Sequence, residues 1–419
     1  MSQVPGRRGA AGRVDARVAV RAPNLYEALR GFCLGAFSVL ARDLERGAEL
    51  PFAFEEHASR GRPTLYEYRP LSRSFVESRA HTLLRREDAR LALLELRHEP
   101  AARIFAGDEG DRAFVDRVLM PLLVEVAEAC GTFDWDDAAF DRAYSKLETS
   151  MFGAQHTYVA LAPVTGVTAS ATIELGGGVR LRRASTGELA AHWPEAAGLL
   201  PHGFGVEADR LCLLELERTL VAADAQPPDA PGELADAITA IRLATSGAVS
   251  AGPVLFERLD WRPFGVRPVV PIAGTEPVGT ATRLDAFRGK LAGDLLERLA
   301  LADDDPELGE ALDRWELALF QAEPFRAESL RESLTALLGG ADGIWAATMR
   351  ASLLLGVRVQ ESELDPDAVR RALVEALLHG DRPALVDTLD EALLGLRPRP
   401  VGFYARLAAA SPSGASVAA

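Results

Sequence analysis

Helix start and stop signals divide the C-terminal third of the sequence, and they constrain the fold more than any other feature. Asp305-Pro306 and Asp365-Pro366 each place a capping carboxylate before a proline at the first helical position. Asp342 is expected to cap another helix between them, and His379-Gly380 is typical of a helix end. The connections are short, which favours antiparallel neighbours. The sequence therefore predicts an antiparallel helical bundle over residues 284–400.

The pattern changes in residues 151–283, where runs of β-branched and alternating residues occur. The glycines Gly176–Gly178 separate two such runs, which predicts a β-hairpin. Leu211–Thr219 and Val254–Trp261 are expected to be further strands. Arg262–Pro277 holds four prolines and is expected to be irregular. We therefore expect a middle domain that is mixed α+β with a small antiparallel sheet.

The N-terminal region, residues 23–150, is expected to be mostly helical. Apolar residues recur at helical spacing from Leu25 onward, and Gly131 is typical of a helix end. Residues 1–22 hold five arginines and one aspartate, a net charge of +4, and are expected to be a disordered basic leader. Residues 401–419 are mainly small and are expected to be a flexible tail. The predicted fold class is α+β, predominantly helical.

Charge and composition narrow the classes of function. The chain of 419 residues has a formal net charge of −15, which argues against broad binding of duplex DNA. Its three cysteines are far apart and form no CxxC pair, so neither a disulfide framework nor a thiolate zinc site is expected. No run approaches the ~18–20 apolar residues of a membrane span, and the leader lacks the apolar core of a signal peptide. We expect a cytoplasmic protein with no membrane partner.

Common sequence motifs of catalysis and cofactor binding are missing. The Gly176–Gly178 run lacks the Lys-Ser or Lys-Thr of a phosphate loop, and no GxGxxG or GxSxG occurs in a fitting context. The histidines are scattered without the i, i+4 pairing of a zinc helix, so no metal site and no cofactor are expected. Asp303–Asp305 could in principle hold a cation, but three acids before a helix are better explained as a cap.

Four stretches of the C-terminal helices carry a family pattern: Arg314–Leu319, Leu334–Leu338, Met349–Gly356 and Val374–Gly380. They resemble the helices of the ApeA-like HEPN family of bacterial proteins, whose small antiparallel helical domain is often an RNase or a nucleotide-binding module. Upstream segments resemble the piece that often precedes this domain: Gly178–Arg183, Glu188, Trp193 and Ile241–Leu243. The resemblance implies a homodimer in which the motif helices face one another.

The RNase motif of that family, RxxxxH, is incomplete in this chain. His379 matches the histidine, but Val374 stands at the arginine position and Glu375 at the following serine position. The chemistry needs a histidine to move protons at the RNA 2′-hydroxyl and an arginine to hold the phosphate charge. Replacement charge could come from four other arginines, which we consider as a phosphate-binding groove beside a catalytic His379: Arg350, Arg370, Arg371 and Arg382.

These residues also have structural interpretations. His379 ends a helix just before a glycine, where its ring can reach the terminal carbonyls and its charge suits the helix dipole. Arg350 could equally be a structural arginine with internal partners.

The sequence therefore leaves several functions open. The first hypothesis is a HEPN-like protein with a degenerate RNase motif that binds RNA, a nucleotide or a protein partner, in bacterial defence or stress response. The second is an active, metal-independent endoribonuclease that uses His379. The third is a non-catalytic scaffold, marked by an exposed apolar face. An enzyme with a site in the middle domain, around His192, Trp193 and His202, is a further alternative that no residue spacing supports.

Overall fold

A computed structural model describes most of the chain. The described residues are 21–57, 65–106, 110–153, 155–185, 188–189, 193, 212–221, 228–252, 254–260, 262–268, 281–398 and 402–403. The predictions for the basic leader and the flexible tail thus lie almost entirely outside them. The fold is α+β and predominantly helical, as the sequence predicts. It comprises two compact units, one of Met1–Leu50 with Ser72–Gly153 and the other of Pro51–Leu71 with Ala154–Ala419.

The first unit is built from helices. Its elements are α1 (Pro23–Glu45), α2 (Ser72–Glu77), α3 (Ala80–Leu83), α4 (Glu87–His98), α5 (Pro100–Ala106), α6 (Asp111–Phe114), a π-helical turn (Val115–Leu119), α7 (Met120–Cys130) and α8 (Asp137–Phe152). The apolar stripe of α1 that begins at Leu25 is buried. Gly35 brings α1 close to α4, because a Cβ there would lie 1.9 Å from the Asp88 carboxylate. Gly131 ends α7 in the left-handed conformation, as its position in the sequence predicts.

A β-hairpin interrupts the region that was expected to be helical. Its strands are β1 (Phe52–His57) and β2 (Leu65–Pro70), paired antiparallel. The hairpin belongs to the second unit, although its flanking residues belong to the first. Its apolar and polar residues alternate only over short stretches, which is a weak signal in a sequence.

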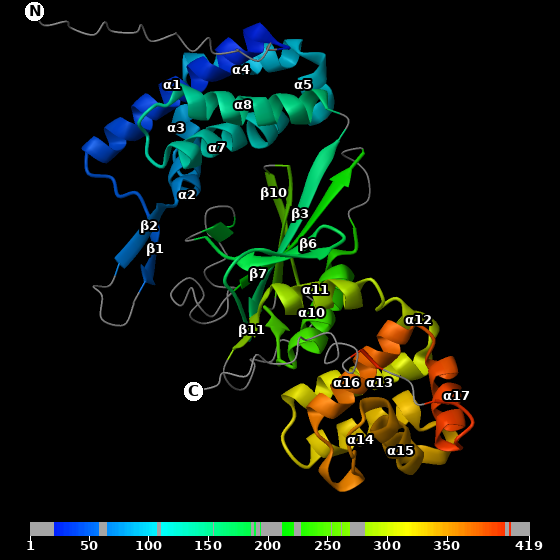
Figure 1. Ribbon diagram of the computed structural model, residues 1–419. Helices are drawn as coiled ribbons and strands as arrows, with labels where there is room; N and C mark the ends of the chain where they lie inside the picture. The colour runs from blue at the N-terminus through cyan, green and yellow to red at the C-terminus, as the bar shows by residue number, and fades with distance from the viewer. Residues whose placement is uncertain are drawn as a thin grey trace, which may run out of the picture. The chain divides into compact units, whose positions relative to one another are not determined.

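The second unit contains a sheet with the strand order β10-β9-β3-β7-β6-β5, in which β8 also pairs with β3 (Figure 1). The strands are β3 (His156–Thr165), β5 (Ile173–Gly176), β6 (Val179–Arg183), β7 (Cys212–Leu220), β8 (Ser250–Ala251), β9 (Val254–Leu259) and β10 (Arg262–Pro268). Every pairing within this sheet is antiparallel. A separate parallel pair joins β4 (Val167–Ala169) to β11 (Thr282–Leu284).

Two predictions for this region have different outcomes. The hairpin around Gly176–Gly178 is confirmed as β5 and β6. The irregular structure expected over Arg262–Pro277 is wrong for Arg262–Pro268, which forms β10, and residues 269–277 lie outside the described residues. This strand lies at the edge of the sheet and has a register shift between Pro263 and Gly265. Edge strands and bulges are the places where a sheet tolerates proline.

Both faces of the sheet are covered. In β3, Tyr158 and Ala160 belong to the large hydrophobic core, and Val159 and Leu161 to a smaller cluster with Trp193. This alternation is the period-2 pattern of a strand with two buried faces. Helices α10 (Ala230–Thr245) and α11 (Ala286–Leu296) pack against each other and against the large-core side.

The C-terminal bundle follows α11 and the short α12 (Leu301–Asp304). Its helices are α13 (Pro306–Phe320), α14 (Phe325–Leu338), α15 (Gly343–Leu355), α16 (Pro366–His379) and α17 (Arg382–Leu393), with 3₁₀ turns at Gly340–Asp342 and Glu361–Glu363. The caps predicted at Asp305 and Asp365 are confirmed, because their carboxylates accept backbone N–H bonds of the first turn. Asp342 precedes α15 but its side chain makes no such bond, and its carboxylate lies 3.4 Å from the guanidinium of Arg350.

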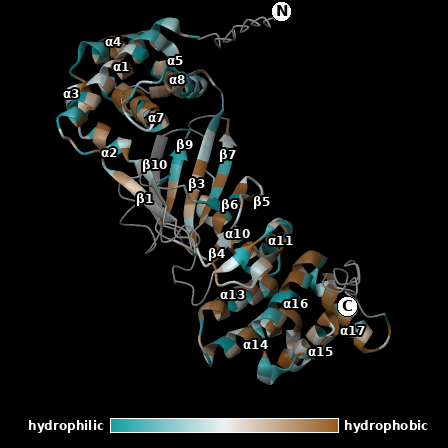
Figure 2. Ribbon diagram, turned by 60° about the vertical axis from the view of Figure 1, so that its left-hand side comes forward, coloured by the Kyte–Doolittle hydropathy of each residue, from teal (hydrophilic) through white to brown (hydrophobic). Residues whose placement is uncertain are grey.

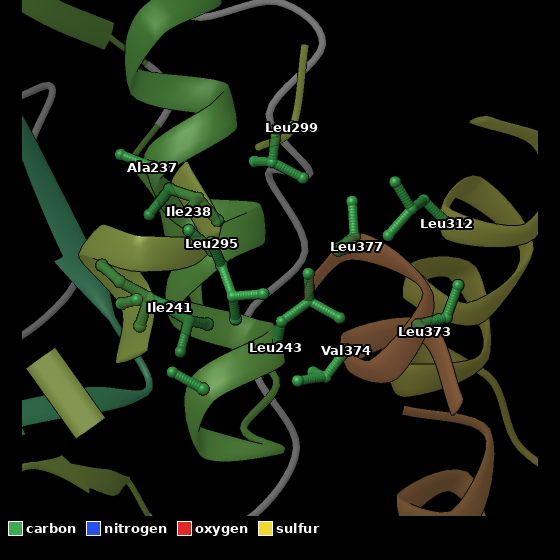
Figure 3. Close-up of a cluster of buried hydrophobic side chains, with 14 of the residues drawn as sticks. Ala237, Ile238, Ile241, Leu243, Leu295, Leu299, Leu312, Leu373, Val374 and Leu377 are labelled. Carbon is green, nitrogen blue, oxygen red and sulfur yellow. The ribbon is translucent and has the colours of Figure 1, made fainter. Parts of the chain in front are cut away.

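The bundle and the sheet share one hydrophobic core. Figure 3 shows Val374 and Leu377 of α16 among side chains of α10 and α11, with Leu373 next to Leu312 of α13. The middle and C-terminal regions that the sequence separates at residue 283 are therefore parts of one compact unit. Helix α16 is where their apolar surfaces meet.

The buried carboxylate of Glu215 on β7 allows the ion pairs of the sheet to be tested. Glu215 is 1% exposed and lies 2.8 Å from Arg180 and 2.5 Å from Arg182. Burial alone would raise its pKa, but the hydrogen bonds and charge of the two arginines outweigh burial and lower the pKa. A carboxyl group whose pKa is lower in the folded protein than in the unfolded chain stabilises the fold at pH values above its unfolded pKa. This stabilisation is lost as the pH falls through the folded-state pKa.

We predict that Glu215→Gln lowers the free energy of unfolding by about 3 kcal/mol at pH 7, because it removes the buried charge that two arginines share and leaves Arg180 with Glu217 and Arg182 with Glu188 as ion-pair partners. The loss of stability between pH 7 and pH 3 should be smaller in this variant than in wild type. Urea unfolding at several pH values measures both effects. Exposed Glu174→Gln on β5 is the control, with a change within about 0.5 kcal/mol. Equal pH dependence in wild type and Glu215→Gln would contradict the assignment.

Candidate functional site

Helix α16 carries the residues that the sequence singles out for chemistry. Asp365 caps it, Pro366 occupies its first turn, and Gly380 ends it with a positive φ of 84°. His379 is the last helical residue and is exposed. Its Nδ1 lies 2.9 Å from the carbonyl oxygen of Asp381, so Nδ1 donates and carries the proton. The ring therefore links the end of α16 to the start of α17.

Val374, at the position of the motif arginine, is fully buried. Figure 3 shows it on the side of α16 that faces Leu243 of α10. An arginine at this position would have to place its guanidinium in an apolar core. The valine is thus part of the contact between the bundle and the sheet.

Glu375, at the position of the motif serine, is also buried, with 6% of its surface exposed. Its carboxylate accepts the backbone N–H of Phe403 at 2.6 Å. Gly402 permits this approach, because a Cβ there would lie within 2.8 Å of the carboxylate oxygens. The C-terminal segment at Gly402–Phe403 is therefore bound to the motif helix, which nothing in the local sequence indicates.

Arg370 and Arg371 lie together at the start of α16. Arg370 is 8% exposed, contacts Asp367 at 2.7 Å and donates to the carbonyl of Leu243 at the end of α10. Arg371 lies 3.2 Å from the same Asp367 carboxylate. Burial would raise the pKa of Asp367, but the two arginines outweigh it and lower the pKa. Nine residues of helix separate Arg370 from His379, a distance of about 13 Å along the axis.

Arg350 and Arg382 both donate hydrogen bonds to backbone carbonyls at the end of α14. Arg350 is buried, binds Asp390 of α17 through two contacts of 2.7 and 2.8 Å, and donates to the carbonyls of Leu338 and Gly339. The hydrogen bond that Arg350 donates to Asp390 raises the pKa of Arg350. These contacts agree with the structural interpretation of Arg350.

Arg382 lies beside a cavity of about 340 Å³ at the end of α16. Its guanidinium contacts Asp305 at 2.7 Å and Glu307 at 2.6 Å, and Asp304 and Asp381 also line the cavity. Burial would raise the pKa of Asp305, but the hydrogen bond from Arg382 outweighs it and lowers the pKa. Four carboxylates and one guanidinium thus line the cavity, so its net charge repels phosphate.

Arg298, which the sequence did not single out, lies at the same end of α16. Its Nη1 donates to the carbonyls of Leu377 and Leu378, and lies 3.6 Å from the position of a Cβ at Gly380. This arginine follows α11 and satisfies the free carbonyls at the end of another helix. No local signal predicts such a long-range cap.

The five predicted site residues therefore do not form one basic groove. Arg370 and Arg371 share Asp367 at one end of α16, whereas His379 and Arg382 lie at the other end. Each of the four arginines has at least one carboxylate partner, and the predictions of catalysis and phosphate binding remain predictions.

The structure also bears on metal binding, on the cysteines and on the alternative site in the middle domain. Within the described residues, no group of three His, Cys, Asp or Glu side chains could hold a metal ion. The three cysteines are free thiols. Trp193 is buried and its ring lies 5.2 Å from that of Phe256, whereas His192 and His202 lie outside the described residues.

Comparisons with known proteins identify no family for this chain. No protein-family model, no curated protein and no solved structure matches the chain. In the part of the chain that the structure describes, no helix has both the length and the apolarity needed to cross a bilayer.

We predict that restoring the motif arginine with Val374→Arg destabilises the protein by more than about 3 kcal/mol, because it buries an unpaired charge. Val374→Ala should cost about 2 kcal/mol through lost apolar burial and a cavity. Leu317→Arg, at a half-exposed position of α13, is the control and should change stability by less than about 0.5 kcal/mol. The free energy of unfolding is measured in urea. A Val374→Arg variant as stable as wild type would show that α16 is not packed as described.

Proposed function

We propose that this chain is a HEPN-like protein without ribonuclease catalysis, which acts by binding a protein partner. The observation that supports this most directly is the use of the two motif positions. Val374 packs in the shared core and Glu375 binds the C-terminal segment. A phosphoryl transition state needs free positive charge, which neither residue supplies.

The charges around the end of α16 favour a protein partner over RNA or a nucleotide. The cavity there presents four carboxylates and one arginine. That arginine, Arg382, already contacts Asp305 and Glu307. A phosphate group would have to break these ion pairs and approach the remaining acids. The chain's net charge of −15 acts in the same direction at long range.

The setting we propose is a bacterial, cytoplasmic defence or stress response, with the chain as a homodimer. This part of the proposal comes from the resemblance of the C-terminal helices to the ApeA-like HEPN family.

An RNA assay tests the proposal. Purified protein at micromolar concentration is incubated with a labelled single-stranded RNA in the presence of EDTA. We expect no cleavage above buffer and no saturable binding at about 0.15 M salt. His379→Ala, which removes an exposed side chain, should give the same result as wild type. Saturable RNA binding that His379→Ala leaves intact would contradict the choice of a protein partner.

The runner-up is a metal-independent ribonuclease that uses His379, and one observation favours it. Arg298 donates to the carbonyl of Leu378, the residue before His379, and lies 3.6 Å from the position of a Cβ at Gly380, so it brings positive charge to this end of α16. Cleavage in EDTA that is lost in His379→Ala would establish this alternative and would overturn the proposed function. Arg371→Ala, at the far end of α16, serves as the control and should retain that cleavage.

A further inference from the structure

Five large apolar side chains are exposed on α15 and at the end of α17. On α15, Trp345 is 72% and Met349 is 43% exposed. At the end of α17, Leu393, Leu394 and Leu396 are 42%, 74% and 70% exposed. We refer to these five residues as the α15–α17 patch. Exposed apolar groups of this size on one part of a protein mark an interaction surface more often than scattered ones do.

The two halves of the patch belong to neighbouring helices. Helices α15 and α17 pack against each other and lie side by side in Figures 1 and 2. The paired contacts from Arg350 to Asp390 fix their relative position. Leu393 and Leu394 follow Asp390 by one turn, and the N–H of Leu396 binds the carbonyl of Glu391. Trp345 and Met349 are four residues apart and so share one face of α15.

Acidic residues lie on the same two helices as this patch. Asp342 is 69% exposed at the start of α15, and Asp390 is 41% exposed on α17. Asp387 and Glu391 are four residues apart on the outer side of α17 and lie on the same face as Leu394. Arg350 is buried and pairs with Asp342 and Asp390, and Arg397 pairs with Glu391. Three carboxylates thus share two guanidinium groups, and Asp387 adds a further exposed carboxylate, so the surroundings of the apolar side chains have an excess of negative charge.

The apolar side chains and the carboxylates of this patch favour one kind of binding partner over others. A twofold dimer through this surface would bring the acidic residues of both copies into one interface, because both copies use the same patch. An anionic bilayer would likewise be repelled by the carboxylates. A segment with apolar side chains on one face and lysines or arginines on its flanks matches both the exposed apolar side chains and the excess of negative charge.

We infer that the α15–α17 patch is the docking site for a basic amphipathic helix of a partner protein. This inference rests on the proposed function, since it names the surface and the class of partner that the proposal requires. Trp345 and Leu394 are the main anchors, because large side chains at the centre of an interface carry most of the binding energy. The exposed carboxylates of Asp342 and Asp387 set the preference for positive charge and speed association.

A binding experiment with a defined probe tests the inference. The probe is a fluorescent 14-residue peptide of leucine and lysine, LKKLLKLLKKLLKL, titrated with the full chain and followed by anisotropy. The matched peptide has glutamate in place of lysine. We expect saturable binding of the lysine peptide, at least tenfold weaker binding of the glutamate peptide, and weaker binding of the lysine peptide as salt rises.

Two sets of variants localise the binding. Trp345→Ser with Leu394→Ser, which keeps the net charge, should weaken binding of the lysine peptide at least tenfold, and Asp387→Lys should weaken it about threefold or more. Phe287→Ser with Leu317→Ser removes exposed apolar groups from α11 and α13 and should change affinity less than twofold. Circular dichroism verifies that each variant is folded.

Three results would overturn the inference. The first is equal affinity of the patch variant and the control variant for the lysine peptide. The second is a concentration-dependent dimer that the patch variant abolishes, which would make a second copy the occupant. The third is binding to phosphatidylglycerol vesicles that the patch variant abolishes. None of these involves RNA, so failure of the inference is distinguishable from the ribonuclease result that overturns the proposed function.

Discussion

The packing of α16 is the interaction on which the second unit depends. One side of this helix contributes Val374 and Leu377 to the contact with α10 and α11, and another contributes Leu373 beside Leu312 of α13 (Figure 3). Polar contacts surround this apolar centre, since Arg370 caps the end of α10 and Asp367 accepts a bond from Ser246. Because the sheet and the bundle share one core here, a change on α16 is felt on both sides.

This packing limits the chemistry that the helix can perform. A phosphate site needs guanidinium groups that are free to leave their internal partners, and the ion pairs of α16 and its neighbours oppose this. Removing one partner from a buried pair leaves an uncompensated charge, which costs several kcal/mol. Helices α15 and α17 bury one face in the core, through residues such as Leu354 and Leu389, and expose large apolar side chains such as Trp345 on other faces. The exposed faces of α15 and α17 are thus available to a partner, whereas the side chains of α16 serve internal packing.

The sequence predicts the local features of this fold well and the long-range ones poorly. Caps at Asp305 and Asp365 and the hairpin at Gly176–Gly178 follow from nearest-neighbour chemistry, so they are readable from a few residues. The edge strand β10 was missed because its prolines are compatible with a strand only at a sheet edge, which the sequence does not reveal. Long-range pairs such as Arg298 with the end of α16, or Phe403 with Glu375, depend on tertiary structure alone.

Hydrogen exchange of the backbone amides of α16 tests the central claim most directly. If α16 joins the sheet to the bundle, the amides of Leu373–Leu377 exchange only on global unfolding and match the slowest amides of β3 and β7. Their protection should then fall in step with those strands as denaturant is added. Exchange of α16 amides at low denaturant, while β3 and β7 remain protected, would contradict the account, because the motif helix could then open without the core.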